Sequence, residues 1–122
     1  IAGHVTIYDK VTVGGMCGLS QFIHLGSHSF IAGYSSVNKD VLPFSMASGI
    51  WATIRATNKV GMERAGYSKE EIQIANQVIR IFTKSGLTRS EAADRVKAEV
   101  AASPIRDKIV EFALSSERGL AI

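Results

Sequence analysis

Three histidines are the side chains of this 122-residue chain best suited to proton transfer near neutral pH. They are His4, His24 and His28. His4 directly follows Gly3, so a backbone N–H with no neighbouring side chain would lie beside an imidazole, an arrangement that suits a developing oxyanion. A lone histidine in a strand is more often a hydrogen-bonded structural residue, and that interpretation stays open for all three.

Other kinds of chemistry find little support in the residues. His24 and His28 are four apart, but in a strand-and-turn context this spacing does not place both on one face, and no cysteine or carboxylate is close in sequence. The single cysteine, Cys17, excludes an internal disulfide. No glycine-rich loop of the Walker or dinucleotide type occurs. The sequence therefore predicts no metal site and no bound cofactor.

Charge is distributed very unevenly along the chain. The net charge is +3, yet the only charged residues before Ala56 are Asp9, Lys10, Lys39, Asp40 and Arg55. A nucleic-acid interface needs a basic patch with interleaved aromatic residues, so we expect no nucleic-acid partner. No apolar run approaches the roughly 18 residues of a membrane span. The mild basic excess is compatible with an acidic partner.

A six-residue repeat must position the candidate histidines. Every sixth residue is aliphatic over seven consecutive hexads, and the next residue is usually small: Ile1, Ile7, Val13, Leu19, Leu25, Ile31 and Val37. Six residues of helix advance about 600°, which cannot keep these side chains on one face. Short strands separated by turns fit the period. Residues 1–44 are therefore predicted to form hexapeptide-repeat coils of a parallel β-helix, with three hexads to a coil.

A helical domain is predicted over residues 68–122. Ser68 with Glu71, and Thr88 with Glu91, form capping boxes that begin two helices. Ser103 followed by Pro104 begins a third, and the sequence predicts helix ends at Gly86 and Gly119. Residues 45–67 show no clean period and are predicted to be an extended crossover. The helices are expected to cap the coils.

Several short motifs occur in the order and spacing of one family: Ile-Ala-Gly-His (1–4), Gly-Gly-Met (14–16), Gln21-Phe22, Gly26-Ser27-His28, Gly33, Asp40-Val41, Asn58, Gly61-Met62 and residues 64–68. The chain resembles the C-terminal half of the acyl-carrier-protein-dependent UDP-N-acetylglucosamine O-acyltransferases, hexapeptide-repeat enzymes of lipid A biosynthesis. The resemblance covers essentially the whole chain. It implies cytoplasmic homotrimers of left-handed parallel β-helices with active sites between subunits.

The resemblance also implies a reaction and the residues that serve it. A 3-hydroxyacyl group passes from acyl carrier protein to the 3-hydroxyl of UDP-N-acetylglucosamine, the first step of the pathway. Each matching position takes its role from the family: the Gly3 amide in the oxyanion hole, His4 on the sugar, Gln21 on the nucleotide sugar, Gly33 at the acyl-length limit, and Asn58 and Arg64 near the uridine and phosphates.

Some family features are missing from the chain. The catalytic histidine and its aspartate partner belong to a motif upstream of Ile1, so we expect this chain to be inactive alone. Ser20 and Ala65 replace a histidine and an arginine of many members. Two alternatives stay open: a sister N-acyltransferase of the same pathway, and a non-catalytic β-solenoid trimerisation module. Asn58 and residues 61–68 favour the O-acyltransferase.

Overall fold

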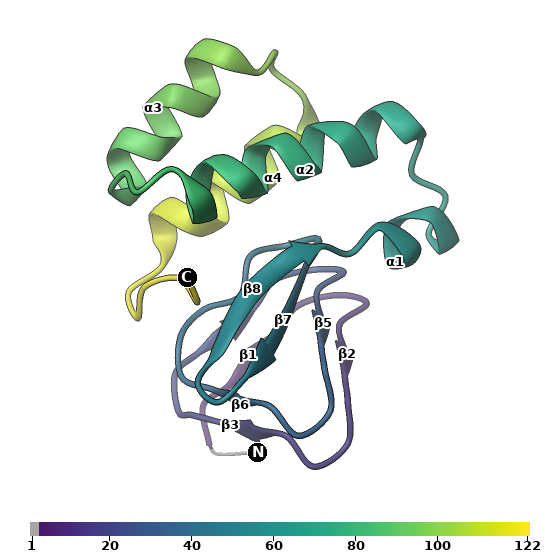
Figure 1. Cartoon of the computed structure of the whole chain (residues 1–122), viewed down its shortest axis with the longest axis vertical. Coiled ribbons are helices and arrows are strands. Elements are labelled where there is room, and N and C mark those ends of the chain that lie inside the picture. Colours follow the sequence, from purple (N-terminus) through teal and green to yellow (C-terminus); the bar gives the residue numbers. More distant parts are fainter. Residues whose placement is uncertain (1–2) are drawn as a thin grey trace.

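The computed structural model describes residues 3–122, with short strands at one end of the molecule and helices at the other (Figure 1). Six two-residue strands come first: β1 (Thr6–Ile7), β2 (Thr12–Val13), β3 (Gly18–Leu19), β4 (His24–Leu25), β5 (Phe30–Ile31) and β6 (Ser36–Val37). Two longer strands and four helices follow: β7 (Ser45–Gly49), β8 (Ala52–Thr57), α1 (Lys59–Arg64), α2 (Lys69–Lys84), α3 (Arg89–Glu99) and α4 (Pro104–Ser115).

The hexad repeat produces the short strands, with each repeating aliphatic residue in the second strand position. Parallel pairing joins β1 to β4, β2 to β5 and β3 to β6, so that each strand lies beside the strand three hexads further along the chain. Three hexads per coil is therefore confirmed. Leu19, Leu25, Ile31 and Val37 are buried, whereas Ile7 is 44% exposed because no coil of the described residues covers it. Ile1 lies outside the described residues.

The turns between strands stack on one another as regularly as the strands do. Their second residues recur every six positions with φ between 57° and 65°: His4, Lys10, Met16, Phe22, His28 and Tyr34. Backbone hydrogen bonds of 2.9–3.0 Å join each turn to the corresponding turn of the next coil. We call residues 3–4 with 21–22 the first turn stack, 9–10 with 27–28 the second, and 15–16 with 33–34 the third.

Residues 45–67 correct the prediction of an extended crossover. Strand β7 continues the coils by pairing in parallel with β5, and then forms an antiparallel hairpin with β8. Phe30 pairs with Met46 and not with Ser48, so this layer is shorter than three full hexads, which hides the repeat from a search in sixes. Helix α1 was not predicted, since six residues are too few to display a helical period.

The three C-terminal helices begin where the sequence predicts. Ser68 and Thr88 cap α2 and α3 with complete capping boxes, and Ser103 caps α4. Helix α2 ends just before Gly86, which has φ of 75°. Helix α4 ends at Ser115 rather than near Gly119, because the chain then turns back towards the coils.

Asp40 fastens this C-terminal tail to the coils. Its carboxylate accepts hydrogen bonds from the His24 backbone N–H (2.7 Å) and the Ser116 hydroxyl (2.5 Å). Its own backbone exchanges hydrogen bonds with Gly119 and Ala121. One hydrophobic core runs through coils and helices. Within residues 3–122, no helix has the length and apolar character needed to cross a membrane.

Candidate active site

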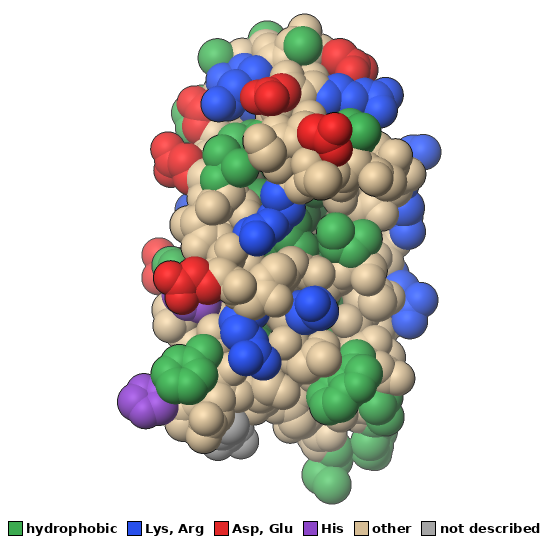
Figure 2. All heavy atoms as spheres, turned by 90° about the vertical axis from the view of Figure 1, so that its left-hand side faces the viewer, with side chains coloured by type: hydrophobic (Ala, Val, Ile, Leu, Met, Phe, Trp, Pro, Cys, Tyr) green, Lys and Arg blue, Asp and Glu red, His purple; other side chains and the backbone are tan. Residues whose placement is uncertain are grey.

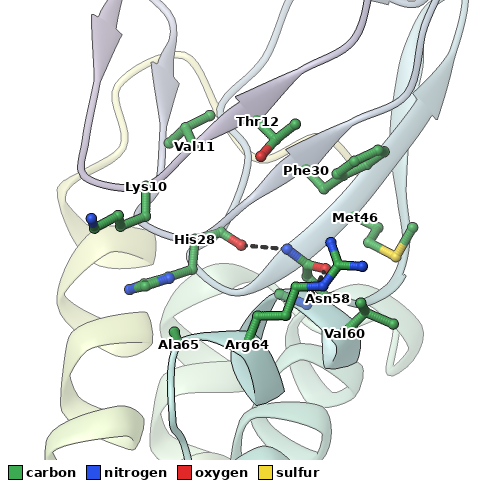
Figure 3. Close-up of a pocket in the computed structure, with 11 residues that line it drawn as sticks. Lys10, Val11, Thr12, His28, Phe30, Met46, Asn58, Val60, Arg64 and Ala65 are labelled. Atoms are coloured by element: carbon green, nitrogen blue, oxygen red, sulfur yellow. Dashed lines mark hydrogen bonds between the residues drawn. The ribbon is translucent and has the colours of Figure 1, made fainter.

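A pocket of about 570 Å³ lies where the second turn stack meets α1 (Figure 3). Its walls come from the turns (Lys10, His28), the faces of β2, β5 and β7 (Thr12, Phe30, Met46) and the α1 segment (Asn58, Val60, Arg64). One side is thus apolar strand surface and the other carries cations. No carboxylate is among the described residues that line it.

Arg64 supplies the fixed positive charge of this pocket. It is the last residue of α1, and Figure 3 shows its side chain reaching from the helix towards the strand residue Met46. Within residues 3–122 it forms no ion pair, so its guanidinium is available to a ligand. A guanidinium can bind the oxygens of a diphosphate through two parallel hydrogen bonds. The pocket is therefore suited to an anionic ligand with an apolar part.

Asn58 stands at the base of the pocket as the N-cap of α1. Its side-chain oxygen accepts a hydrogen bond from the Gly61 N–H at 3.1 Å, and its amide nitrogen donates to the His28 carbonyl at 2.8 Å. The side chain is nearly buried. Asn58 therefore joins α1 to the second turn stack.

His28 lines the pocket although it was not among the predicted site residues. Its ring stacks on Phe44 at 5.5 Å, and its Nε2 lies 3.5 Å from the Tyr67 hydroxyl. Burial lowers the pKa of His28 below its usual 6.5, and the nearby Lys108 and Lys10 add to this effect. The imidazole is therefore neutral at pH 7. The three-hexad period could have found it, because His28 stacks above Lys10.

The predicted oxyanion and sugar residues lie on the first turn stack. Gly3 is exposed, and its Cα faces open space. The His4 ring stacks on Phe22 with centroids 5.1 Å apart, and Gln21 is the exposed neighbour of Phe22. A second pocket of about 560 Å³ is lined by His4 together with residues that include His24, Glu117 and Arg118.

Gly33, the predicted acyl-length residue, lies on the third turn stack. It is exposed, and a Cβ atom added there would come 3.4 Å from the Gly15 carbonyl oxygen. The side chains beside it are apolar and accessible, with Tyr34 76% and Met16 81% exposed. The surroundings suit an apolar ligand.

The six predicted residues therefore fall into three groups on one chain. Asn58 and Arg64 share a pocket, Gly3, His4 and Gln21 share a turn stack, and Gly33 stands apart from both. In the described part of the chain, no three histidine, cysteine or carboxylate side chains gather as a metal site would require.

Comparison with known protein families shows which family the chain belongs to. The family profile described as UDP N-acetylglucosamine O-acyltransferase, domain 2, matches residues 40–121, which contain β7, β8 and all four helices. The chain belongs to this family. The matched residues include Asp40, Asn58 and Arg64, but none of the three turn stacks.

Relatives of this acyltransferase family extend the match to the coils. The chain is 41% identical over 116 residues to an acyl-[acyl-carrier-protein]–UDP-N-acetylglucosamine O-acyltransferase from Myxococcus xanthus, covering 95% of this chain and 45% of the relative. A relative with the same description from Anaeromyxobacter is 36% identical over 120 residues, covering 98% and 47%. The chain thus spans about half the length of the relatives it matches.

Solved structures agree closely with the fold. A UDP-N-acetylglucosamine acyltransferase from Bacteroides fragilis matches with a TM-score of 0.95 and 34% identity, over 98% of this chain and 47% of that one. An Arabidopsis UDP-N-acetylglucosamine acyltransferase matches with a TM-score of 0.90 and 28% identity, over 100% and 46%. The arrangement of coils and helices is therefore that of these acyltransferases.

Proposed function

We propose that this chain is the part of an acyl-carrier-protein-dependent UDP-N-acetylglucosamine O-acyltransferase that binds the nucleotide sugar. The observation that carries the proposal is the pocket between the second turn stack and α1. The Arg64 guanidinium lies there beside apolar strand residues and has no ion-pair partner among residues 3–122. Arg64 also lies in the segment that matches the acyltransferase family. The diphosphate would lie on Arg64 and the uridine near Asn58.

The reaction places a different demand on the first turn stack. The sugar 3-hydroxyl gives its proton to the general base as its oxygen attacks the thioester carbonyl; a C–O bond forms, the C–S bond breaks, and the departing carrier thiolate takes the proton. Negative charge collects on the carbonyl oxygen in the transition state, where a backbone N–H can stabilise it. We assign that role to the Gly3 amide. His4 and Gln21 would hold the sugar and the nucleotide sugar, respectively.

The general base lies outside this chain in our proposal. Such a base needs a partner that orients the imidazole, commonly a carboxylate. In the described residues, the histidine rings that are hydrogen-bonded have tyrosine partners: His24 has Tyr8 and His28 has Tyr67. The family's histidine–aspartate pair would supply the missing chemistry from a preceding segment.

Separation of the candidate residues on one chain supports assembly into a homotrimer. We propose that the coils form a left-handed parallel β-helix and that neighbouring copies bring different turn stacks together in one cleft. Gly33 would then border the acyl chain, where the absence of a side chain leaves room for a longer one. In this proposal 1–44 forms the coil region, which β7 extends, and 68–122 the helical domain; the rest of 45–67 links the two.

Acyl carrier protein, which is acidic, is the proposed donor. On the side of the molecule away from α1, lysine and arginine side chains lie along the middle of the face (Figure 2). Around the second turn stack, Lys10 and Lys108 both act on His28, and Arg64 lies in the adjoining pocket. Complementary charge favours encounter with an acidic partner. We also propose that the enzyme is cytoplasmic, as the family resemblance implies.

Calorimetric titration with UDP-N-acetylglucosamine tests the proposal. Replacing Arg64→Ala should raise the dissociation constant about tenfold or more, because a hydrogen-bonded charge contributes about 1.5–3 kcal/mol. Arg80→Ala on α2 is the matched control, since this arginine is exposed and does not line the pocket. Sedimentation of the same samples reports whether they are trimers.

Three results would contradict the proposal or a part of it. Trimeric wild-type chain that releases no heat with the nucleotide sugar would favour the trimerisation module. Equal affinity of the wild-type and Arg64→Ala chains would remove Arg64 from the site. Turnover of acyl carrier protein thioester by the 122-residue chain alone would disprove the placement of the base outside it.

A further inference from the structure

We propose that Asn58 and Tyr67 are positioning residues that fasten α1 at both ends to His28 and thereby set the place of the Arg64 guanidinium. This inference rests on the role proposed above for Arg64. It gives Asn58 a different task from the one that the family resemblance implies. The residue would act on the substrate through Arg64.

The Asn58 side chain is engaged at both ends. Its oxygen accepts a hydrogen bond from the Gly61 N–H, and its nitrogen donates one to the His28 carbonyl. Only 8% of the residue is exposed. Its backbone N–H also donates to the Phe44 carbonyl at 2.7 Å. The amide keeps one further N–H and one further oxygen lone pair, but with so little of the residue exposed a ligand has scant access to them.

Gly61 shows how closely this contact is fitted. A Cβ atom at position 61 would lie 2.3 Å from the Asn58 amide nitrogen and 2.8 Å from its Cγ. No side chain larger than hydrogen can occupy that space while the amide stays in place. Gly61→Ala should therefore push the Asn58 amide from its position without deleting it.

Tyr67 holds the other end of the helix. Its ring meets the His28 ring edge-on at 5.3 Å and the Phe44 ring at 5.4 Å. Its hydroxyl reaches His28 Nε2 at 3.5 Å, and its backbone N–H donates to the Met62 carbonyl at 3.0 Å. The carbonyl of His28 thus holds the start of α1, and its imidazole holds Tyr67 just beyond the end of the helix.

A helix as short as α1 depends on such contacts. Six residues form less than two turns, and isolated helices below about 12 residues are marginal in water. Arg64 is the last residue of α1, so any loosening at either end moves its guanidinium. Binding of an anion would then also have to order the helix, and this loss of conformational freedom would lower the affinity.

Amide hydrogen exchange of the whole 122-residue chain tests the fastening without a ligand. We expect Asn58→Ala and Gly61→Ala to speed exchange of the amides at 62–66 about tenfold or more, because local opening is no longer resisted by the buried contacts. Amides of α3 should exchange as in the wild type. Lys59→Ala, an exposed change in the same helix, is the control and should leave exchange unchanged.

Titration with UDP tests the link to Arg64. Asn58→Ala and Tyr67→Ala should each weaken UDP binding about tenfold. Ser116→Ala, which removes a hydrogen bond to Asp40 in another part of the molecule, lowers stability but should leave UDP affinity unchanged. This comparison separates positioning from general loss of structure.

The outcomes distinguish this inference from the proposed function. Wild-type exchange at 62–66 in Asn58→Ala would overturn the fastening, whatever the chain binds. Faster exchange with unchanged UDP affinity would overturn the link to Arg64. If the wild-type chain binds no UDP while exchange at 62–66 rises in the variants, the proposed function fails and the fastening of α1 stands.

Discussion

Asp40 joins two distant parts of the chain with one buried carboxylate. It is 1% exposed, and its two oxygens accept from the His24 backbone and the Ser116 hydroxyl. Asp40→Ala would leave the His24 N–H unpaired and remove the side-chain hydrogen bond to the C-terminal tail, although the backbone hydrogen bonds to Gly119 and Ala121 remain, so we expect a loss of about 2–4 kcal/mol in the free energy of unfolding. Urea unfolding measures this loss of stability. Ser116→Ala should cost only about 1 kcal/mol because the His24 contact remains. A loss below about 0.5 kcal/mol in Asp40→Ala, as for an ordinary surface change, would contradict this account.

His28 makes the fold sensitive to acid. Burial first, and then Lys108 and Lys10, lower its pKa below 6.5, while Asp9 raises it. The unfolded chain therefore binds a proton more readily than the folded one, so the stabilisation is present above pH 6.5 and is lost as the pH falls through the folded pKa. We expect the free energy of unfolding to fall as the pH drops below about 6.5. In His28→Gln this fall should be shallower, and equal slopes in the two chains would refute the assignment.

At the scale of elements, close packing between coils depends on glycine at particular positions. A Cβ atom at Gly14 would lie 2.5 Å from the backbone nitrogen of Gly33 in the next coil, whereas one at Gly15 would meet nothing within 4 Å. Gly14→Ala should therefore lower the free energy of unfolding by about 1–3 kcal/mol, the usual cost of overpacking. Gly15→Ala is the matched control and should change it by less than about 0.5 kcal/mol. Thermal unfolding of both variants measures the difference, and equal midpoints would argue against stacked coils.

The elements with strong local signals were predictable from the sequence. The six-residue period identified the strands and their pairing three hexads apart, since one aliphatic residue per strand must face the core. Capping boxes at Ser68 and Thr88 located two helix starts correctly. The six-residue period does not continue into β7, because that layer is shorter than three hexads. Helix α1 has too few residues to show a helical pattern. Its only signal was Asn58, an N-cap residue without a capping box.

At the scale of the whole molecule, the candidate site was predictable only in pieces. Arg64 and Asn58 do share a pocket, and the resemblance named both. The neighbours that complete the pocket, such as His28 and Thr12, come from successive coils, and only the register of stacking reveals them. How the turn stacks of neighbouring copies would meet in the proposed trimer is not encoded in any local pattern. In our proposal, the parts of the acyltransferase site therefore lie on separate turn stacks of one chain.

The central claim is that the nucleotide sugar binds between the second turn stack and α1. Titration of the ¹⁵N-labelled chain with UDP-N-acetylglucosamine, followed by amide chemical shifts, tests it most directly. We predict the largest shifts at Lys10, Thr12, His28 and residues 60–65, and none in α3. Shifts centred on another surface, or no shifts at saturating nucleotide sugar, would contradict the account.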